Sequence, residues 1–373
     1  MMNETDSKVF FELLKIGLWG KSSAIVHVES PICWDEIRKN AQRQTVSAIV
    51  FDGLEHLLLN KKLAVEPSKT FKLKWISEVS HIERQNKKVQ LILRKVHQYL
   101  KELHIPYLLL KGQSCASYYL NPLHRQSGDI DLFIGDREYQ RLIDVLHSKN
   151  ITMGDFTRKH FDCNIDGVEI EFHRLSCFLY NPILNKKLQN ICRKEEWRKT
   201  NYLFIDGLEI RFPAPTYNVF FIFMHFYIHF LQVGIGLRQI CDWVLILKKE
   251  ENNIDWISLE KYVRSVGAMR AWLAFYHFSC KYLGLKLKRV PRWMEKMNES
   301  DVTYLNHDII AAGNFGKYGV SMKTRTFGKG IFYNINSYYH LILRQAKTFK
   351  FCPMEVACYP LYKVLARSGI IKY

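Results

Sequence analysis

The residues 108–136 read LLLKGQSCASYYLNPLHRQSGDIDLFIGD, and their centre decides what fold to expect. The run from Ile130 to Ile134 has the apolar character of a buried strand, yet it begins beside Asp129 and includes Asp131. Side chains two residues apart on a strand project from one face, so these two aspartates are expected to lie together. Two carboxylates on one face repel each other and lose hydration, which is costly unless cations bind there. The stretch therefore predicts a strand that carries a cation site.

A third acidic side chain is expected from the segment VEIEFH at 168–173. Glu169, Glu171 and His173 share one face of this predicted strand, and an adjacent strand would bring one glutamate to the aspartate pair. Mg²⁺ prefers hard oxygen ligands and keeps positions for substrate phosphates. Three carboxylates can hold two metal ions about 3.5–4 Å apart, which is the arrangement for in-line nucleotidyl transfer. We therefore expect two Mg²⁺ ions, with Glu171 also suited to accept a proton. The expected metal ligands and catalytic residues are Asp129, Asp131 and Glu171.

The segment before the aspartates has the features of a phosphate site. Lys111 and Gly112 stand where a short strand, Tyr107–Leu110, ends and a short helix, Gln113–Leu120, is expected to begin. Free amides and the helix dipole favour phosphate there, and glycine lets the phosphate approach closely. The opposing interpretation is a pair of aspartates facing water beside a turn of no function. The expected nucleotide-binding residues are Lys111, Gly112, Gln113, Ser114, Arg125 and Gly128.

Hydrophobic periodicity divides the chain into three regions. Residues 1–104 have helical spacing, in the runs Val9–Leu18, Trp34–Leu58 with a break near Thr45, and Lys69–Leu103. Residues 105–212 mix strand and helix patterns and form a small α/β unit, with a helix at Arg137–Ser148. Residues 213–373 are again helical. Two hairpins, each turning at Asp-Gly, are expected from His160–Ile165 with Val168–Phe172 and from Tyr202–Ile205 with Leu208–Phe212.

Composition limits the partners and the compartment. The chain has 373 residues, a formal net charge of +18 and nine cysteines, without any Cys-x-x-Cys pair. The charge favours a polyanionic partner, which is a nucleoside triphosphate, a nucleic acid or an anionic membrane surface. Charge alone does not predict nucleic-acid binding when a compact binding motif is missing. The odd cysteine count and an acidic N-terminus without a basic leader favour a cytoplasmic protein.

The most apolar segment, 217–237, reads YNVFFIFMHFYIHFLQVGIGL and reaches the length of a membrane span. It also contains His225, His229 and Gln232, so we predict a buried helix and no transmembrane segment. The two histidines lie one turn apart, as do Arg238 and Asp242. These four residues could be a structural hydrogen-bonded or ionic set, a metal site, or the lining of a cleft. The possible cleft-lining residues are His173, His225, His229, Arg238 and Asp242.

The order of these motifs resembles the DNA polymerase β-type nucleotidyltransferase superfamily, and most closely its bacterial uncharacterised-nucleotidyltransferase family. In that pattern a glycine turn and a helix precede a strand with two acids, and a third acid follows on a later strand. The resemblance implies an α+β fold, with a small mixed β-sheet nucleotidyltransferase core flanked by helical N-terminal and C-terminal regions. Lys111 and Gly112 replace the Gly-Ser turn of the wider superfamily. The matching segments are HIPYLLLKGQS, HRQSGDIDLFI, VEIEFHRL, HFYIHFLQVGIGLRQICDW and WDEIRKNAQRQTVSAIVFDGL.

The sequence thus predicts a Mg²⁺-dependent nucleotidyltransferase. It would move a nucleoside monophosphate from an NTP to a hydroxyl of an unknown acceptor, which is a small molecule, a protein or a nucleic acid, and release pyrophosphate. One alternative is a non-catalytic descendant that binds a nucleotide or a partner. Another, prompted by the basic charge, is a terminal transferase that modifies nucleic acid.

Overall fold

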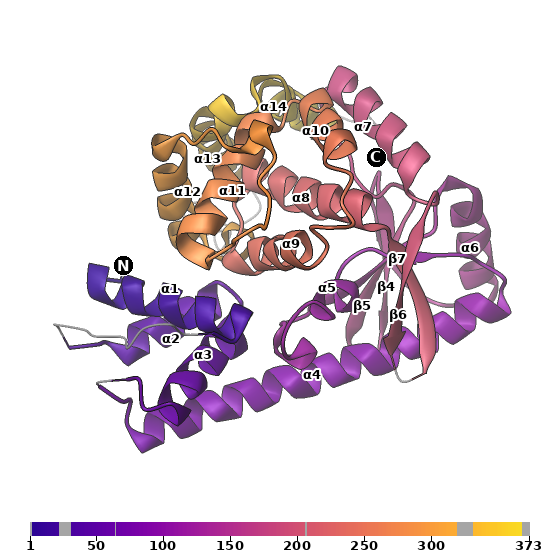
Figure 1. Cartoon of the computed structure of the whole chain (residues 1–373). Helices are drawn as coiled ribbons and strands as arrows, with labels where there is room; N and C mark the ends of the chain where they lie inside the picture. The colour runs from indigo at the N-terminus through magenta and orange to yellow at the C-terminus, as the bar shows by residue number, and fades with distance from the viewer. Residues whose placement is uncertain (1, 22–30, 64, 206, 319–330, 368–373) are drawn as a thin grey trace.

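The structure is a computed structural model that describes residues 2–21, 31–63, 65–205, 207–318 and 331–367. Helices precede and follow a small mixed sheet, so the predicted α+β fold class is confirmed. In Figure 1 the sheet lies at one side of the molecule, with the N-terminal helices below and the C-terminal helices above and across from it.

The N-terminal helices follow the predicted pattern, including the break at Thr45. Helices α1 and α3 pack closely because glycines replace side chains where they cross. A Cβ atom on Gly17 would lie 1.9 Å from the carbonyl oxygen of Ile49, and one on Gly53 would lie 1.9 Å from that of Leu13. Figure 1 shows α4 running from these helices to the sheet. The bounds are α1 (Glu4–Trp19), α2 (Trp34–Arg43), α3 (Ser47–Leu59) and α4 (Lys69–Glu102).

The central sheet has five strands in the order β1-β2-β5-β4-β3. Strands β2 and β5 are parallel, and the other pairs are antiparallel. The predicted hairpin between β4 and β5 is confirmed, and its turn residues Asp166 and Gly167 have φ of 52° and 77°, as a tight hairpin turn requires. Strand β3 was not predicted. The bounds are β1 (Leu108–Leu109), β2 (Asp129–Phe133), β3 (Met153–Phe156), β4 (His160–Ile165) and β5 (Val168–His173).

Alternation along the strands gives the sheet one apolar and one polar face. Ile130, Ile170 and Phe161 from three neighbouring strands are fully buried on the apolar face. Helix α6 (Asp136–Ser148) covers part of it, where the Tyr139 ring lies 5.2 Å from the Phe161 ring. The polar face is therefore the one that remains for a binding site.

Two connections differ from the sequence prediction. The helix expected over 113–120 is only α5 (Gln113–Ala116), because the amides of Tyr118 and Tyr119 bond three residues back and the chain passes into a 3-10 turn, η1 (Pro122–His124). Helix α7 (Pro182–Glu195), capped by the Asn181 side chain, was not predicted. The two strands of the second predicted hairpin are confirmed as β6 (Thr200–Ile205) and β7 (Leu208–Pro213), which form a separate two-stranded sheet, and Asp206 of its predicted turn lies outside the described residues.

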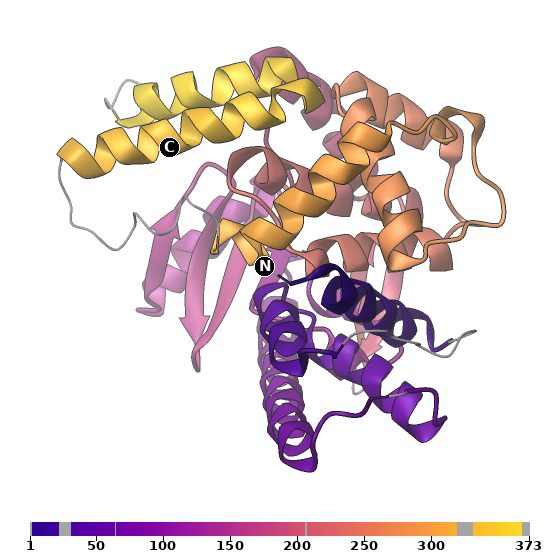
Figure 2. The same ribbon diagram turned by 90° about the vertical axis from the view of Figure 1, so that its left-hand side faces the viewer.

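The C-terminal region packs around an aromatic core that includes Phe223, Phe226, Trp243 and Trp272. Figure 2 shows α13 and α14 side by side in gold and yellow. The remaining elements are α8 (Pro215–Gln232), α9 (Leu237–Lys249), α10 (Trp256–Ser265), α11 (Met269–Leu283), η2 (Arg292–Met294), α12 (Glu299–Ala312), η3 (Asn314–Gly316), α13 (Ile331–Thr348), η4 (Phe349–Phe351) and α14 (Pro353–Arg367).

The apolar segment 217–237 is divided between two elements. Helix α8 ends at Gln232, because Gly234 takes a φ of 106° before α9 begins at Leu237. Most of the α8 side chains are buried in the aromatic core. Within the described residues, no helix is long and apolar enough to cross a membrane.

Candidate functional site

The parallel pairing of β2 and β5 assembles three carboxylates on the polar face. The register places Asp129 opposite Glu169 and Asp131 opposite Glu171. Ligand oxygens of Asp129, Asp131 and Glu171 all lie within 4.8 Å of one another. Two strands that are about forty residues apart in sequence thus bring together the three acids expected from the sequence. The fourth, Glu169, is exposed.

His173 joins two of these acids. Its Nε2 atom lies 3.1 Å from Asp131 Oδ1 and 3.0 Å from Glu171 Oε2. Asp131 is fully buried, and its second oxygen, Oδ2, has no hydrogen-bond partner in the described chain. An unpaired buried carboxylate oxygen costs free energy unless a donor or a cation reaches it. The three carboxylates offer only hard oxygen ligands, and one of these oxygens, Asp131 Oδ2, is unpaired within the described residues. This set of ligands fits a divalent cation.

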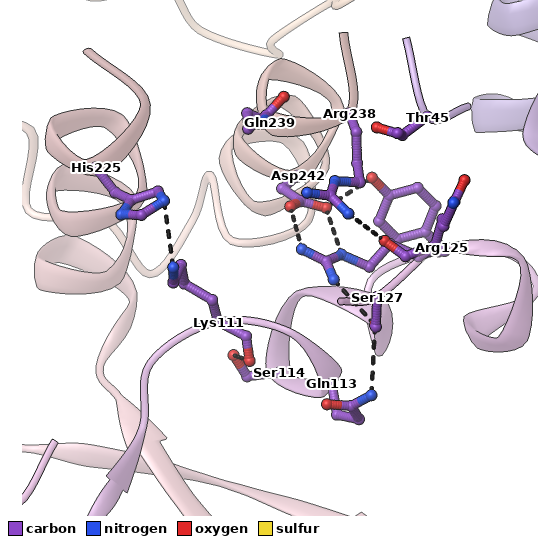
Figure 3. A network of polar contacts seen from close by, with 12 residues as sticks. Thr45, Lys111, Gln113, Ser114, Arg125, Ser127, His225, Arg238, Gln239 and Asp242 are labelled. Atoms are coloured by element: carbon purple, nitrogen blue, oxygen red, sulfur yellow. Dashed lines mark hydrogen bonds and ion pairs between the residues drawn. The ribbon is translucent and has the colours of Figure 1, made fainter. Parts of the chain in front are cut away.

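Lys111 points into the same cluster. Its Nζ atom lies 2.8 Å from Asp131 Oδ1. It also lies 3.3 Å from Nε2 of His225 on α8, the contact that Figure 3 shows. Burial alone would lower the pKa of Lys111, but the carboxylates of Asp131, Asp129 and Glu171 outweigh it and raise the pKa. The lysine therefore stays charged and neutralises part of the trio. The sequence predicted that Lys111 binds phosphate, and in the structure its ammonium group contacts Asp131.

Glu171 is ionised in this environment. Burial alone would raise its pKa, but the hydrogen bond from His173 and the charge of Lys111 lower the pKa to about 2. Burial alone would lower the pKa of His173, and its bonds to Asp131 and Glu171 raise it. A carboxyl with so low a pKa suits cation binding but is a weak proton acceptor. The role of proton acceptor that the sequence suggested for Glu171 is therefore disfavoured.

A small cavity of about 30 Å³ lies beside Asp129 and is lined by Lys111, Arg125, His225, Arg238 and Asp242 among others. Arg125 and Asp242 form a buried two-pronged ion pair, with Nε–Oδ1 at 3.0 Å and Nη2–Oδ2 at 2.7 Å (Figure 3). The sequence interpretation of Arg238 and Asp242 as an ion pair one turn apart is wrong, because Arg125 takes both carboxylate oxygens. Arg125 also donates from Nη1 to the Ser127 hydroxyl at 3.1 Å, so its donors are largely committed.

Arg238 has a different environment from Arg125. It donates from Nη1 to the carbonyl oxygen of Gln126 at 2.6 Å, but its Nε has no partner in the described chain. Burial lowers the pKa of Arg238, and the neighbouring Arg125 charge lowers it further. A buried guanidinium with a spare donor beside Asp129 is a feature that an anionic ligand could satisfy.

The predicted phosphate turn is only partly as expected. Gly112 has a φ of 65°, a conformation that glycine adopts without strain. Helix α5 is a single turn of four residues, so it has little dipole to offer. The Ser114 amide and hydroxyl both bond to the carbonyl of Lys111, and Gln113 Nε2 bonds to Ser127. Gly128 is exposed before β2.

A second cavity, of about 190 Å³, adjoins the trio through His160, whose Nδ1 atom lies 3.6 Å from Glu171 Oε2. Lys159, His160 and His229 line it, together with the aromatic residues Phe178, Tyr180 and Tyr362. Burial lowers the pKa of His229 to about 3 and that of His160 to about 4, so both rings are neutral. Lys159 makes no ion pair with a carboxylate of the described chain. Burial lowers the pKa of Lys159, and the nearby charge of Lys111 lowers it further.

Sequence reasoning missed Lys159 and His160. The signal that could have found His160 is the hairpin register, since counting back from the turn at Asp166-Gly167 places it opposite His173. His225, Arg238 and Asp242 do line the Asp129 cavity, and His229 lines the second one. In the described part of the chain, the groups of side chains that could bind a metal do not include His225, His229 or Asp242.

Comparison with known proteins places the chain in a family. A family model described as uncharacterised nucleotidyltransferase matches residues 30–284. This range contains the carboxylate trio, most of the N-terminal helices, and helices α8 and α9, which contribute residues to the cavities. The chain belongs to this nucleotidyltransferase family. Family membership supports nucleotidyl transfer as the general activity.

Two other comparisons add little to that assignment. No curated protein matches this nucleotidyltransferase significantly. Among solved structures, a crystal structure of an antigenic nucleotidyltransferase-like protein from Paracoccidioides brasiliensis is similar at 16% identity and a TM-score of 0.33. The match covers 54% of this chain and 95% of that one.

Proposed function

We propose that this nucleotidyltransferase transfers a nucleoside monophosphate from an NTP to a hydroxyl of an acceptor and releases pyrophosphate, with Mg²⁺ held by Asp129, Asp131 and Glu171. The observation that carries the proposal is the convergence of these three side chains, with oxygens within 4.8 Å of one another and one buried oxygen unpaired. Such a donor set supports two cations for in-line transfer.

In this reaction the acceptor oxygen bonds to the α-phosphorus while the bond from that phosphorus to the bridging oxygen breaks. Pyrophosphate leaves with the electron pair, and the hydroxyl proton passes to solvent. Bound Mg²⁺ would lower the pKa of the acceptor hydroxyl and neutralise the phosphates. Asp129, Asp131 and Glu171 would hold the cations, and His173 positions two of these acids through its Nε2 atom, which lies within hydrogen-bond distance of both.

The two substrates would approach the carboxylate trio from different sides. The triphosphate would lie on the Asp129 side, where Lys111 and the spare donor of Arg238 provide positive charge. Gly112 and Gly128 lie on the same side, whereas Arg125, Gln113 and Ser114 donate their hydrogen bonds within the protein and would support this side without binding the triphosphate directly. The acceptor would enter through the cavity on the Glu171 side, next to Lys159 and the aromatic side chains.

The direct test is incubation of the purified protein with Mg²⁺, NTPs labelled in the α-phosphate and a cell extract. We expect a labelled product and released pyrophosphate from wild type and neither from Asp129→Asn. The matched control is Asp162→Asn, because Asp162 faces Glu171 across β4 and β5 but lies outside the trio. Unchanged labelling by Asp129→Asn would remove that residue from the mechanism.

The same preparation separates the alternatives. If the protein gives no product and Mg²⁺-ATP raises its melting temperature equally in wild type and Asp131→Ala, the non-catalytic descendant is favoured. The net charge of +18 is the observation behind the terminal-transferase alternative. That alternative requires RNA binding that weakens steeply with salt, and a flat salt response would exclude it.

A further inference from the structure

A second group of possible metal ligands adjoins the acidic trio and differs from it in chemistry. His160, Glu171 and His173 bring one ligand atom each to within 4.8 Å of one another, and Glu171 also belongs to the trio. We propose that these three residues form a binding site for a zinc-class divalent cation, separate from the Mg²⁺ ligands Asp129 and Asp131. The proposal goes beyond nucleotidyl transfer, because the site would bind its ion without a nucleotide.

The hairpin of β4 and β5 builds this group. His160 begins β4 and lies directly opposite His173, the last residue of β5. Glu171 lies two residues before His173, so its side chain leaves the same face. The two imidazole rings lie 4.8 Å apart at 61° to each other. One turn at Asp166-Gly167 therefore sets the whole arrangement through its register.

The distances suit a small tetrahedral ion. His173 Nε2 lies 3.0 Å from Glu171 Oε2, and His160 Nδ1 lies 3.6 Å from the same oxygen. Zinc bonds to nitrogen and oxygen of about 2.0–2.1 Å, at tetrahedral angles, separate neighbouring ligand atoms by about 3.4 Å. The two observed separations lie on either side of that value. Three protein ligands leave the fourth position open, as in catalytic zinc sites.

Unpartnered atoms distinguish this group from an ordinary cluster of polar residues. His160 Nδ1 is buried and has no hydrogen-bond partner in the described chain, and Glu171 Oε2 at 3.6 Å is too far to be one. His173 is 4% exposed, and its Nε2 atom, the ring nitrogen that faces Glu171, already contacts Asp131 and Glu171. Asp131 Oδ2, next to the group, is also unpaired. Buried ring nitrogens in a purely structural role are normally hydrogen-bonded.

The ligand types select the ion. Two imidazole nitrogens with one carboxylate suit zinc and its neighbours in the transition series, whereas Mg²⁺ favours sites made only of oxygen. Asp129 and Asp131 supply such oxygens on the other side of Glu171. The face of the sheet would thus offer two unlike cation positions that share one carboxylate.

The test is titration of the metal-free, full-length protein with Zn²⁺ by calorimetry in a large excess of Mg²⁺, together with ¹⁵N-histidine NMR. We expect one Zn²⁺ per chain at this site and a shift of the ring-nitrogen signals of His160 and His173. His160→Gln should weaken this binding at least about tenfold, a loss that removal of even an outer-shell partner can cause. The matched control is His229→Gln, which lines the same cavity outside the ligand group.

Two results would overturn the proposal: Zn²⁺ binding that leaves both histidine signals unmoved, or a His160→Gln protein that folds and binds Zn²⁺ as tightly as wild type. If His160→Gln does not fold, the wild-type NMR shifts decide. Asp129→Asn should keep the zinc site, so loss of nucleotidyl transfer in that variant with Zn²⁺ binding intact separates this site from the proposed reaction.

Discussion

Two buried polar groups of this protein, one around Asp242 and one around Asp131, differ in whether every carboxylate oxygen has a hydrogen-bond partner. Around Arg125 and Asp242, both carboxylate oxygens are bonded to the guanidinium and Oδ1 also accepts from the Tyr119 hydroxyl at 2.7 Å. Around Asp131, one oxygen is paired with Lys111 and His173, while the other has no partner in the described chain.

The difference separates structure from function. A buried charge whose hydrogen bonds are all satisfied within the protein stabilises one arrangement of the chain and has no capacity left for a ligand. A buried charge with an unused oxygen keeps one acceptor that a bound cation or donor can satisfy. The first group therefore predicts effects on stability, and the second predicts effects on activity.

The largest effect is expected at the unsatisfied group. Asp131→Asn removes a metal ligand, so we expect nucleotidyl transfer to fall by on the order of 1,000-fold, as several kcal/mol of lost charge stabilisation implies. Pyrophosphate release measures the activity, and urea unfolding of the same samples measures stability. Retained activity, or a loss of stability as large as that of Asp242→Ala, would erase the distinction between the two groups.

The next effect concerns the satisfied group. Asp242→Ala leaves the Arg125 guanidinium buried without its counter-charge, and we expect a loss of about 3–5 kcal/mol in the free energy of unfolding. Urea denaturation measures it. The double variant Arg125→Met with Asp242→Leu is the control, because it removes both charges and should recover much of the loss. A double variant as unstable as Asp242→Ala would show that packing, and not the unpaired charge, causes the effect.

Loss of a single hydrogen bond to the Asp242 carboxylate should reduce the free energy of unfolding by a smaller amount. Tyr119→Phe removes the hydroxyl that donates to Asp242, and we expect about 2 kcal/mol of destabilisation, as for a bond to a charged group. The neighbouring Tyr118→Phe is the matched control, since its hydroxyl donates to the half-buried Glu250 at 2.8 Å. Equal effects of the two changes would mean that burial of the acceptor does not set the cost.

The smallest effect is expected at a third group, where His124 is satisfied on both ring nitrogens. Its Nδ1 lies 2.7 Å from Asp52 and its Nε2 lies 3.0 Å from Glu83, linking α3 and α4 to the turn before β2. Burial alone would lower the pKa of His124, but the bonds and charges of Asp52 and Glu83 raise it. Burial meanwhile raises the pKa of Asp52, although His124 opposes this.

A raised histidine pKa sets the sign of the pH dependence. The stability from protonated His124 is fully present below the unfolded pKa of about 6.5 and is lost as the pH rises through the higher folded value. His124→Gln should therefore cost about 1 kcal/mol at pH 6 and less at pH 9, measured by urea unfolding. His97→Gln is the control, because the pKa of His97 is lowered and the trend should be opposite. If the costs of His124→Gln and His97→Gln changed in the same direction with pH, the assignment of a raised pKa to His124 would be contradicted.

Local pattern was enough to predict much of the fold. The alternation that places Asp129 and Asp131 on one face, the Asp-Gly turn of the β4–β5 hairpin and the helical spacing of residues 69–103 each depend on neighbours in sequence. Helix α7 and strand β3 were missed. The buried residues Leu184, Leu188 and Ile191 of α7 do have helical spacing, so the pattern was present in the sequence and overlooked, whereas β3 is short, irregularly paired and largely exposed.

The partners of the charged residues could not be predicted in the same way. Arg238 and Asp242 are one turn apart on α9, which makes them a plausible pair, yet the chain fold brings Arg125 to Asp242 from 117 residues away. The contact between Lys111 and Asp131 likewise joins two segments whose docking the spacing does not indicate. A pairing between distant segments depends on how whole elements dock, and sequence spacing holds no information on that.

By itself, the sequence determined which side chains share a face of each strand, because alternation is a property of the extended backbone. Tertiary structure alone decided which strands lie next to each other, and so which acids, histidines and cations meet. The parallel docking of β2 on β5 puts Asp131 beside Glu171, and the β4 edge adds His160. The physical reason is that backbone geometry acts over a few residues, whereas packing and burial act across the whole chain.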